Sequence, residues 1–386
     1  MKGVDALEKY FMAAIKAANF MGSQRVIKIS KFFGSAERSW HARREEVEKI
    51  NLPPNALESF LEFKKKFPEA PEMLEGFCEK KKFNLCCIFD EDYPPILKNI
   101  PTAPAIFYYR GNLKTFAERV AVVGTRDATE YGKRVAQKIG SELAAAGLTI
   151  VSGAAKGIDT FAHIGAMKTG RTAAILGGGI NYYFKGDRKK FFEEISESGI
   201  VISEFSPNFI PNQGTFPARN KIIAGLSRAV IVVEAGEKSG ALLTAEDAKK
   251  ISRDVFAVPG EIFSEKSLGC NNLIKNGAIL LNNVEDIFQK YNFAAEKNIF
   301  AEDEKIFSEK NLSAPVESKK ILENVTVKLE GAEKKIFDII PAEEYITLDE
   351  IFEQAEDVDV TEISSIMIEL ELKNCIVENA GRYRRS

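Results

Sequence analysis

The 386-residue sequence has no long apolar run, few cysteines and no paired cysteine motif. No stretch approaches the roughly 18–20 apolar residues that a membrane-spanning helix needs. The charged N-terminal segment does not have the form of a signal peptide. The five cysteines form neither a CxxC pair nor an even disulfide framework. We therefore predict a cytoplasmic protein with reduced thiols and no membrane span.

Histidine is also scarce, since only His41 and His163 are present. A zinc site with two histidines would need both of them, and a site with three is impossible. The sequence also lacks the phosphate-binding GxxxxGK[ST] loop, the GxSxG nucleophile elbow and the HExxH zinc motif. No cysteine–histidine or carboxylate pair stands out as a catalytic couple. We predict no metal, no cofactor and no catalytic residue.

Charge of one sign is not in excess, because 53 basic and 56 acidic side chains give a net charge of −3. The balance is uneven along the chain. Residues 118–290 hold 22 basic and 19 acidic side chains, a net +3, which leaves −6 for the rest. This central segment can hold a local anion site inside an acidic protein.

The clearest pattern in the sequence is an alternation of short β-branched runs with helical segments between residues 119 and 289. The apolar runs show no polar alternation, which indicates strands buried on both faces of a parallel sheet. We predict an α/β fold, an extended Rossmann-like, doubly wound and mostly parallel sheet over residues 84–290, with six or seven strands between residues 119 and 289.

The two ends of the chain have other patterns. Residues 1–83 predict a small helical domain, because apolar residues recur at helical spacing. Residues 291–328 are charged and weakly periodic, which is typical of a linker. Residues 329–386 predict three helices, one capped by Thr347 and the last at Glu362–Lys373, followed by a β-hairpin. That order is typical of a winged-helix domain.

Ligands of open α/β sheets bind beyond the carboxyl ends of the strands. The loop after the first strand of the central domain holds Gly124, Thr125 and Arg126. They offer a close backbone turn, a hydroxyl and a guanidinium fork that suits phosphate. Arg126 could instead pair with a nearby acid.

The loop after the next strand is rich in small residues and looks like a cradle for an anion. Its candidate residues are Ser152, Gly153, Lys156 and Gly157. Asp159 is predicted to cap the helix that follows. A structural pair between Asp159 and His163 is favoured over an acid–base couple.

The loop Gly177–Gly179 is not a dinucleotide fingerprint and predicts a tight turn. The next loop is more informative, because it sets an aromatic ring beside basic and amide side chains, which suits single-stranded nucleic acid. Its candidates are Phe216, Arg219, Asn220 and Lys221. A core phenylalanine at a solvated helix start is the alternative.

The last of these loops begins at Glu234, includes Ser239 and Gly240, and ends in a helix start near Thr244. Glu234 could bind a ribose hydroxyl or orient Arg219 or Lys221. The residues alone do not separate these roles.

These loops belong to an ordered series of segments that resembles the DprA (Smf) family of DNA-processing proteins. The series is YPPILKNIPTAPAIFYYRGNL at 93–113, AVVGTRDATEYG at 121–132 and IVSGAAKGIDTFAHIGAM at 150–167, then ISEFSPN, FPARNKIIAGLS, VVEAGEKSGALLTA, VFAVPG and NLIKNGA. The resemblance implies a homodimeric protein that binds and protects incoming single-stranded DNA. It also implies help in loading RecA recombinase during natural transformation, and the family is not established as an enzyme.

The resemblance also implies which residues form the strand-binding pocket. They are Gly124, Thr125, Arg126, Lys156, Gly157, Phe216, Arg219 and Asn220. Lys221 stands where the family often has arginine, so it keeps the charge and loses the planar fork.

Two other functions remain as alternatives. A nucleotide phosphoribohydrolase of the lysine-decarboxylase-like group would bind phosphates at the same loops, but its PGGxGTxxE signature is absent. A winged-helix regulator with a nucleotide-sensing domain is disfavoured by the acidic Glu362–Lys373 segment. For the C-terminal domain we favour protein contact or weak DNA contact, with Arg382, Arg384 and Arg385 as phosphate partners.

Overall fold

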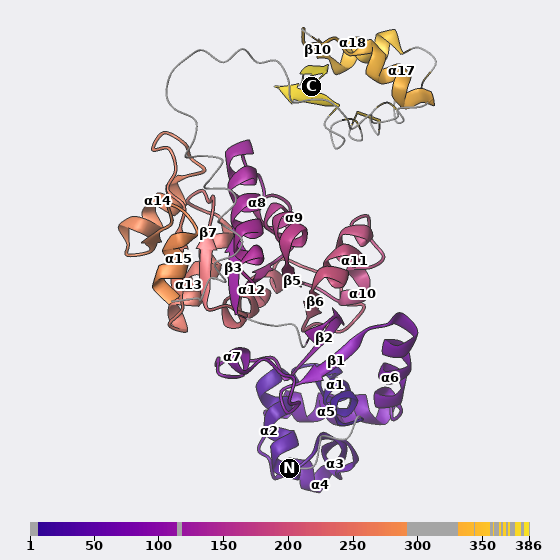
Figure 1. Cartoon of the computed structure of the whole chain (residues 1–386). Coiled ribbons are helices and arrows are strands. Elements are labelled where there is room, and N and C mark those ends of the chain that lie inside the picture. The colour runs from indigo at the N-terminus through magenta and orange to yellow at the C-terminus, as the bar shows by residue number, and fades with distance from the viewer. Residues whose placement is uncertain are drawn as a thin grey trace. The chain divides into compact units, whose positions relative to one another are not determined.

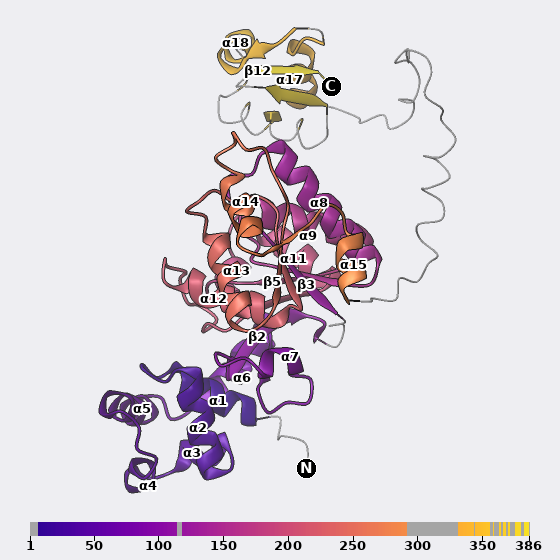
Figure 2. The same ribbon diagram turned by 90° about the vertical axis from the view of Figure 1, so that its left-hand side faces the viewer.

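We describe a computed structural model of the chain (Figures 1 and 2). The structure describes residues 7–113, 118–291 and 331–385, the last range without 343, 356–357, 359–362, 364–365, 368–369, 371–374 and 380–381. The predicted linker falls almost entirely outside these residues. Contacts divide the chain into two units, Met1–Phe307 and Ser308–Ser386, which are described one at a time.

A nine-stranded sheet lies at the centre of the first unit, in the order β1-β2-β6-β5-β4-β3-β7-β8-β9. The seven strands from β6 to β9 in this order pair in parallel, and β1 and β2 pair antiparallel at one edge. The predicted mostly parallel sheet is confirmed. The strands are β1 (Asn84–Cys87), β2 (Ile106–Gly111), β3 (Arg119–Val123), β4 (Thr149–Ser152), β5 (Arg171–Ile175), β6 (Ile200–Ser203), β7 (Ala229–Val232), β8 (Asp254–Ala257) and β9 (Ile279–Leu280).

Helices cover both faces of the sheet. On one face Val120 and Val122 of β3 pack in a core with residues of α8 (Glu130–Ala145), α9 (Ile158–Thr169) and α15 (Glu285–Tyr291). On the other face Ala121 and Val123 join a core with α11 (Lys189–Ser198), α12 (Thr215–Leu226), α13 (Gly240–Lys250) and α14 (Leu268–Lys275). Successive residues of a strand point to opposite faces. Because both faces are buried, the strands read as continuous apolar runs.

The N-terminal region is helical, as predicted. Its buried residues, such as Phe11, Trp40 and Phe60, belong to the same core as Ile106 of β2. The helices are α1 (Glu8–Ala17), α2 (Ser23–Phe33), α3 (Ala36–His41), α4 (Arg44–Glu48), α5 (Pro54–Lys66) and α6 (Ala70–Lys81), and two short ones, α7 (Pro95–Lys98) and α10 (Ile180–Tyr183), follow later in the chain.

The second unit contains α17 (Gly331–Ile339), α18 (Leu348–Gln354) and a three-stranded sheet in the order β10-β12-β11. Its strands are β10 (Ile346–Thr347), β11 (Ile376–Asn379) and β12 (Arg382–Arg385). Thr347 caps α18 in a capping box with Glu350, as the sequence predicts. The expected helix Glu362–Lys373 falls mostly outside the described residues.

Arg385 has a structural role that the sequence does not reveal. Its Nε donates to the carbonyls of Phe337 (3.1 Å) and Ile340 (2.6 Å), and its Nη2 donates to that of Asp338 (2.8 Å). The guanidinium therefore satisfies the last carbonyls of α17. Of the three arginines predicted to meet phosphate, this one is already engaged.

Cys78, Cys86, Cys87 and Cys270 are buried thiols, and no disulfide joins the cysteines of the described chain. Burial raises the pKa of Cys78 to about 11, so this thiol stays protonated at neutral pH. No helix among the described residues has both the length and the apolar character needed to cross a bilayer.

Candidate nucleic-acid interface

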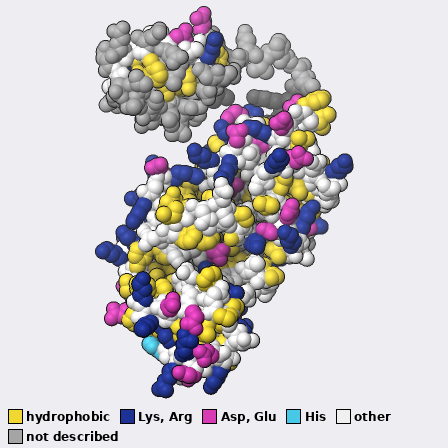
Figure 3. Space-filling model, turned by 180° about the vertical axis from the view of Figure 1, so that it is seen from behind, with side chains coloured by type: hydrophobic (Ala, Val, Ile, Leu, Met, Phe, Trp, Pro, Cys, Tyr) yellow, Lys and Arg dark blue, Asp and Glu magenta, His cyan; other side chains and the backbone are white. Residues whose placement is uncertain are grey.

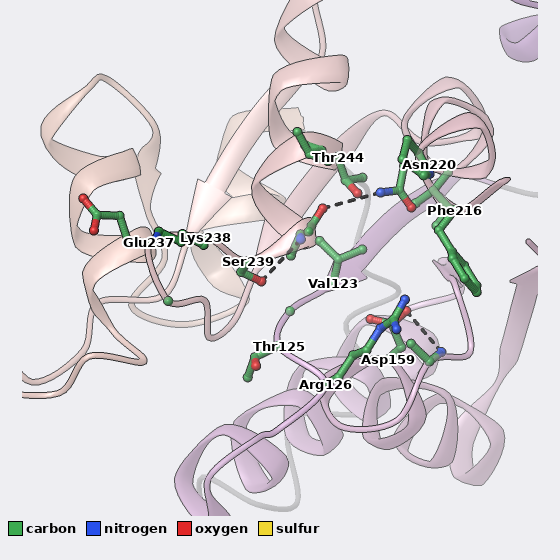
Figure 4. Close-up of a pocket in the computed structure, with 18 of the residues that line it drawn as sticks. Val123, Thr125, Arg126, Asp159, Phe216, Asn220, Glu237, Lys238, Ser239 and Thr244 are labelled. Carbon is green, nitrogen blue, oxygen red and sulfur yellow. Dashed lines mark hydrogen bonds between the residues drawn. The ribbon is translucent and has the colours of Figure 1, made fainter. Parts of the chain in front are cut away.

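A pocket of about 880 Å³ lies at the carboxyl ends of β3 and β7 (Figure 4). The strand order reverses between these two neighbours, because the chain runs from β3 through β4 and β5 to β6 on one side and from β7 through β8 to β9 on the other. Ligands of open α/β sheets bind in the crevice at such a point. Ten of the predicted residues line the pocket: Gly124, Thr125, Arg126, Asp159, Phe216, Arg219, Asn220, Ser239, Gly240 and Thr244.

Helix α12 begins at Thr215, so Phe216 and Pro217 belong to its first turn. Pro217 is tolerated because the first turn of a helix needs no backbone donor there. Phe216, Arg219 and Asn220 are therefore three and four residues apart on one helix, and they share a face. This face lines the pocket.

Lys221 does not lie on that face. Its side chain is exposed and is absent from the pocket lining. Desolvation raises the pKa of the half-buried Glu204 carboxyl, and Lys16 and then Lys221 oppose that shift. The expected contact of Lys221 with the strand in the pocket does not fit this placement.

Arg126 and Phe216 meet at the rim of the pocket. The guanidinium carbon of Arg126 lies over the Phe216 ring, 4.9 Å from its centroid. Within the part of the chain that the structure describes, Arg126 forms no ion pair, so the predicted alternative of an acidic partner is not present. An exposed cation stacked on a half-buried ring is ready to contact phosphate and base.

Arg219 is buried, with 5% of its surface exposed, and it braces the ends of two strands. Its Nη1 donates to the carbonyls of Gly153 (2.5 Å) and Ile175 (2.6 Å), and its Nε donates to Asn220 Oδ1 (3.1 Å). Burial lowers the pKa of Arg219, and the nearby Asp159 opposes that shift. Most of its donors are thus used within the fold.

Asp159 is the buried acid beside Arg219, and it does not cap α9. The N-cap of α9 is Gly157, and Asp159 Oδ2 instead accepts from the backbone amides of Gly153 (3.0 Å) and Ala155 (3.4 Å). Burial raises the pKa of Asp159, whereas Arg219 and these amides oppose the shift. The Asp159 carboxylate thus stabilises the conformation of the loop after β4 by bonding two of its backbone amides.

Two more residues of this loop are structural. Ser152 is fully buried and donates its hydroxyl to the carbonyl of Val122 in β3 (2.6 Å). The amide of Gly153 is bonded to Asp159 and its carbonyl to Arg219. Neither has a free group to offer a ligand, so their expected place in the cradle does not fit the structure.

Lys156 and Gly157 form the exposed end of the same loop. Gly157 has a φ of 77°, and a side chain there would strike the carbonyl oxygens of Thr125 and Arg126. Glycine is therefore required where this loop meets the loop after β3. Lys156 is exposed beside the pocket and is not part of its lining.

Glu234 joins the loops on the two sides of the crevice. Its Oε2 accepts from the amide of Thr129 (2.9 Å), its Oε1 accepts from the Thr129 hydroxyl (2.8 Å), and its carbonyl accepts from the amide of Thr125 (2.7 Å). Both carboxylate oxygens are engaged and the residue is buried. Its carboxylate contacts Thr129 rather than Arg219 or Lys221, so of the roles left open the orienting one does not fit the structure.

The start of α13 forms the opposite wall of the pocket. Ser239 caps the helix by accepting from the amide of Ala241 (3.4 Å), and Asn220 Nδ2 donates to the carbonyl of Gly240 (3.5 Å). Thr244 is buried one turn further on and lines the pocket. The N-terminal amides of this 11-residue helix favour an anion.

The loop after β8 also lines the pocket, and no motif in the sequence predicts this contribution. Its Lys266 lines the pocket and pairs with Asp127 of the β3 loop at 2.7 Å. The two residues are 139 positions apart, so sequence spacing carries no signal of this contact. Lys238 adds a further exposed cation from the β7 loop.

His163 does not line the pocket, and it is paired with Thr172 rather than with Asp159. Its Nδ1 lies 2.6 Å from the Thr172 hydroxyl, which itself donates to the carbonyl of Ile150 (2.9 Å). The hydroxyl must therefore accept from Nδ1–H, and Nε2 is left buried with no partner among the described residues. Burial, with Arg188 and Arg219 nearby, lowers the pKa of His163 to about 3.

This depressed pKa predicts a loss of stability in acid. An unfolded histidine takes up a proton near pH 6.5, whereas the folded one does so only near pH 3. The unfolded state therefore binds more protons in between, and stability falls as the pH decreases through that window. Between pH 6.5 and pH 5 we expect the wild type to lose about 1–2 kcal/mol more than His163→Asn. Urea unfolding at several pH values measures this, and parallel curves for the two proteins would contradict it.

Comparison with known proteins identifies the family. A family model described as DNA recombination-mediator protein A matches residues 84–292, which is more than half of the chain. The chain belongs to this family. The predicted resemblance to DprA and Smf proteins is thereby confirmed.

Family members match over most of the chain. Protein Smf of Escherichia coli is 31% identical over 94% of both chains. Protein Smf of Synechocystis is 36% identical over 70% of this chain and 69% of its own. The X-ray structure of DNA processing protein A (DprA) from Streptococcus pneumoniae is 33% identical, with a TM-score of 0.63 over 75% of this chain and 98% of that one.

Proposed function

We propose that the pocket between the β3 and β7 loops binds single-stranded DNA. The observation that carries this proposal is the contact of Arg126 with Phe216, an exposed cation and a ring presented together at the rim. The amides at the start of α13 and the exposed cation Lys238 add positive potential, whereas the charge of Lys266 is offset by its ion pair with Asp127. Flat bases and phosphates are the units that such a site accepts.

The positive charge that we assign to DNA binding is confined to the side chains at the pocket. On the face shown in Figure 3, basic side chains are interspersed with acidic ones, and no broad surface of one sign is seen. Duplex binders usually present an extended basic surface to two phosphate strands. The face in Figure 3 offers no such surface, which supports the proposal of a single strand held at the pocket.

In the cell, we propose that the protein is a recombination mediator that protects incoming strands during natural transformation and helps to load RecA. The family assignment supports this role. We further propose that it acts as a homodimer. Light scattering of the purified chain tests the dimer, and RecA filament assembly on a protected strand, with and without the protein, tests the loading.

We propose that the protein acts by binding and not by catalysis. Among the described residues of the pocket lining, Asp159 is buried with its Oδ2 bonded to backbone amides, and Glu237 and Glu265 are exposed. No acid–base couple is formed by these groups. Release of a free base from nucleotides would instead support the phosphoribohydrolase alternative.

For residues 329–386 we propose a winged-helix domain that contacts protein or binds DNA weakly. Arg382 is exposed, whereas Arg384 lies over Tyr345 and Arg385 is bonded to α17. Arg382 is thus the cation best placed to meet phosphate. If Arg382→Ala leaves duplex binding by the full chain unchanged, the DNA role of this domain is excluded and protein contact remains.

Salt titration of oligothymidylate binding tests the proposed function. The logarithm of the binding constant should fall with the logarithm of salt concentration, with a slope of about −0.7 for each phosphate that is neutralised. A duplex of the same length should bind more weakly. An affinity that is the same at low and high salt would exclude a site that works by holding phosphates.

A further inference from the structure

Three consecutive glycines after β5 form a floor under the loop that follows β6. A side chain on Gly177 would lie 2.7 Å from the Phe216 ring, and one on Gly178 would lie 2.9 Å from the Pro211 ring. One on Gly179 would strike the backbone of residues 206–209. The absence of side chains lets the loop lie directly on the glycines, so this motif does more than make a tight turn.

Backbone hydrogen bonds hold the loop in this position. The amide of Gly179 donates to the carbonyl of Phe209 (2.8 Å), and the amide of Asn181 donates to that of Pro207 (2.9 Å). The Phe209 ring is stacked on Phe205, with centroids 5.3 Å apart and planes 25° apart. These contacts fix the conformation of the loop, so the side chains that it exposes have defined positions.

This surface exposes large apolar side chains next to the pocket. Tyr182 is 47% exposed, Phe209 39% and Ile210 70%. We call these three residues the shelf. They follow β5 and β6, on the same edge of the sheet as the pocket, which Phe216 lines from the same glycine floor. Apolar groups gathered at a surface mark a binding site.

The charge around the shelf indicates what it binds. Lys156 belongs to the β4 loop, and β4 lies between β3 and β5 in the sheet. Arg188 ties this loop to the segment after α10, since its Nη1 donates to the carbonyl of Ala154 (2.7 Å). Lys156 and Lys185 are exposed and form no ion pair with any described residue. Lys156 follows a strand that lies between those of the pocket and the shelf, and Lys185 belongs to the same segment as Tyr182. Exposed rings accompanied by such cations suit the bases and phosphates of one strand.

We propose that the shelf of Tyr182, Phe209 and Ile210 is a second stacking surface for bases of the strand that leaves the pocket. This inference rests on the proposed function of the pocket. The strand runs from β3 toward β6, passing Lys156, rather than toward β8. Three inter-strand spacings of about 4.8 Å separate β3 from β6, so the path is roughly 14 Å long.

Binding of short and long oligothymidylates by the full chain tests this path. Oligomers of about 4 and about 16 nucleotides bracket the usual site sizes of single-strand binders. In the wild type the long oligomer should bind more tightly than the short one. Tyr182→Ala should weaken binding of the long oligomer about 5- to 150-fold. Ile210→Ser removes apolar contact but no stacking ring, so it should weaken that binding by less. Both variants should leave binding of the short oligomer unchanged. A long oligomer with abasic positions outside the pocket should bind like the short one.

Phe263→Ala is the matched control, because Phe263 is an 88% exposed ring on the β8 loop at the other side of the pocket. It should change neither affinity. If Phe263→Ala weakens the long oligomer and the shelf variants do not, the proposed path is wrong. If length or bases beyond the pocket add nothing, the shelf is excluded while the pocket stands. If the wild type binds neither oligomer, the proposed function itself fails, and the shelf with it.

Discussion

Replacing Arg219 with alanine should lower the free energy of unfolding by about 3–5 kcal/mol. The guanidinium is buried and bonds the carbonyls of Gly153 and Ile175. Its removal leaves these carbonyls without a donor and leaves Asp159 buried without its nearby positive charge. Each unpaired group lowers the free energy of unfolding, because water cannot reach a buried carbonyl or carboxylate to solvate it. Urea unfolding of the two proteins at neutral pH measures the difference.

Arg126→Ala is the matched control for this experiment. Arg126 is exposed, so its loss should change the free energy of unfolding by no more than about 0.5 kcal/mol. Both arginines line the same pocket, and the comparison separates support of the fold from contact with a ligand. An Arg219→Ala protein with the same free energy of unfolding as the wild type would show that these buried hydrogen bonds do not contribute to stability.

Arg126→Ala should weaken oligothymidylate binding about 10- to 150-fold, the effect of losing a charged hydrogen bond worth about 1.5–3 kcal/mol. The Phe216 ring would remain, but without the cation stacked on it. The salt dependence should become shallower by about 0.7 for the phosphate that is lost. Arg126→Lys should be intermediate, because lysine keeps the charge and loses the planar fork. Fluorescence anisotropy over a range of salt concentrations measures all three effects.

Arg134→Ala provides the control for loss of positive charge alone. Arg134 is an exposed arginine on α8, outside the pocket lining. It should leave both the affinity and its salt dependence nearly unchanged. An equal loss of affinity in Arg126→Ala and Arg134→Ala would mean that binding depends on the overall charge of the protein and not on the pocket.

The sheet could be predicted from the sequence because strands that are buried on both faces consist of continuous apolar runs. The apolar runs predict the strands, and parallel strands bring the loops after them to one edge. This reasoning finds Arg126, Phe216 and Asn220, which the structure places in one pocket. The cap at Thr347 is likewise local, since it depends on residues within one turn.

The direction of individual side chains could not be predicted in the same way. Ser152, Arg219 and Glu234 have the residue types of a binding site, yet the structure turns each of them into the fold. Apart from Asn220, which is next to Arg219, the partners of these side chains lie 30 to 105 positions away in the sequence. The pairing of Lys266 with Asp127 is hidden for the same reason. Such contacts depend on which strands become neighbours, and a motif does not encode that.

A crystal structure of the full chain with bound oligothymidylate tests the central claim most directly. We predict a nucleotide between the β3 and β7 loops, with a base against the Phe216 ring, a phosphate at Arg126 and the next bases toward Tyr182. Nucleotides bound elsewhere on the protein, with this pocket empty, would contradict the account.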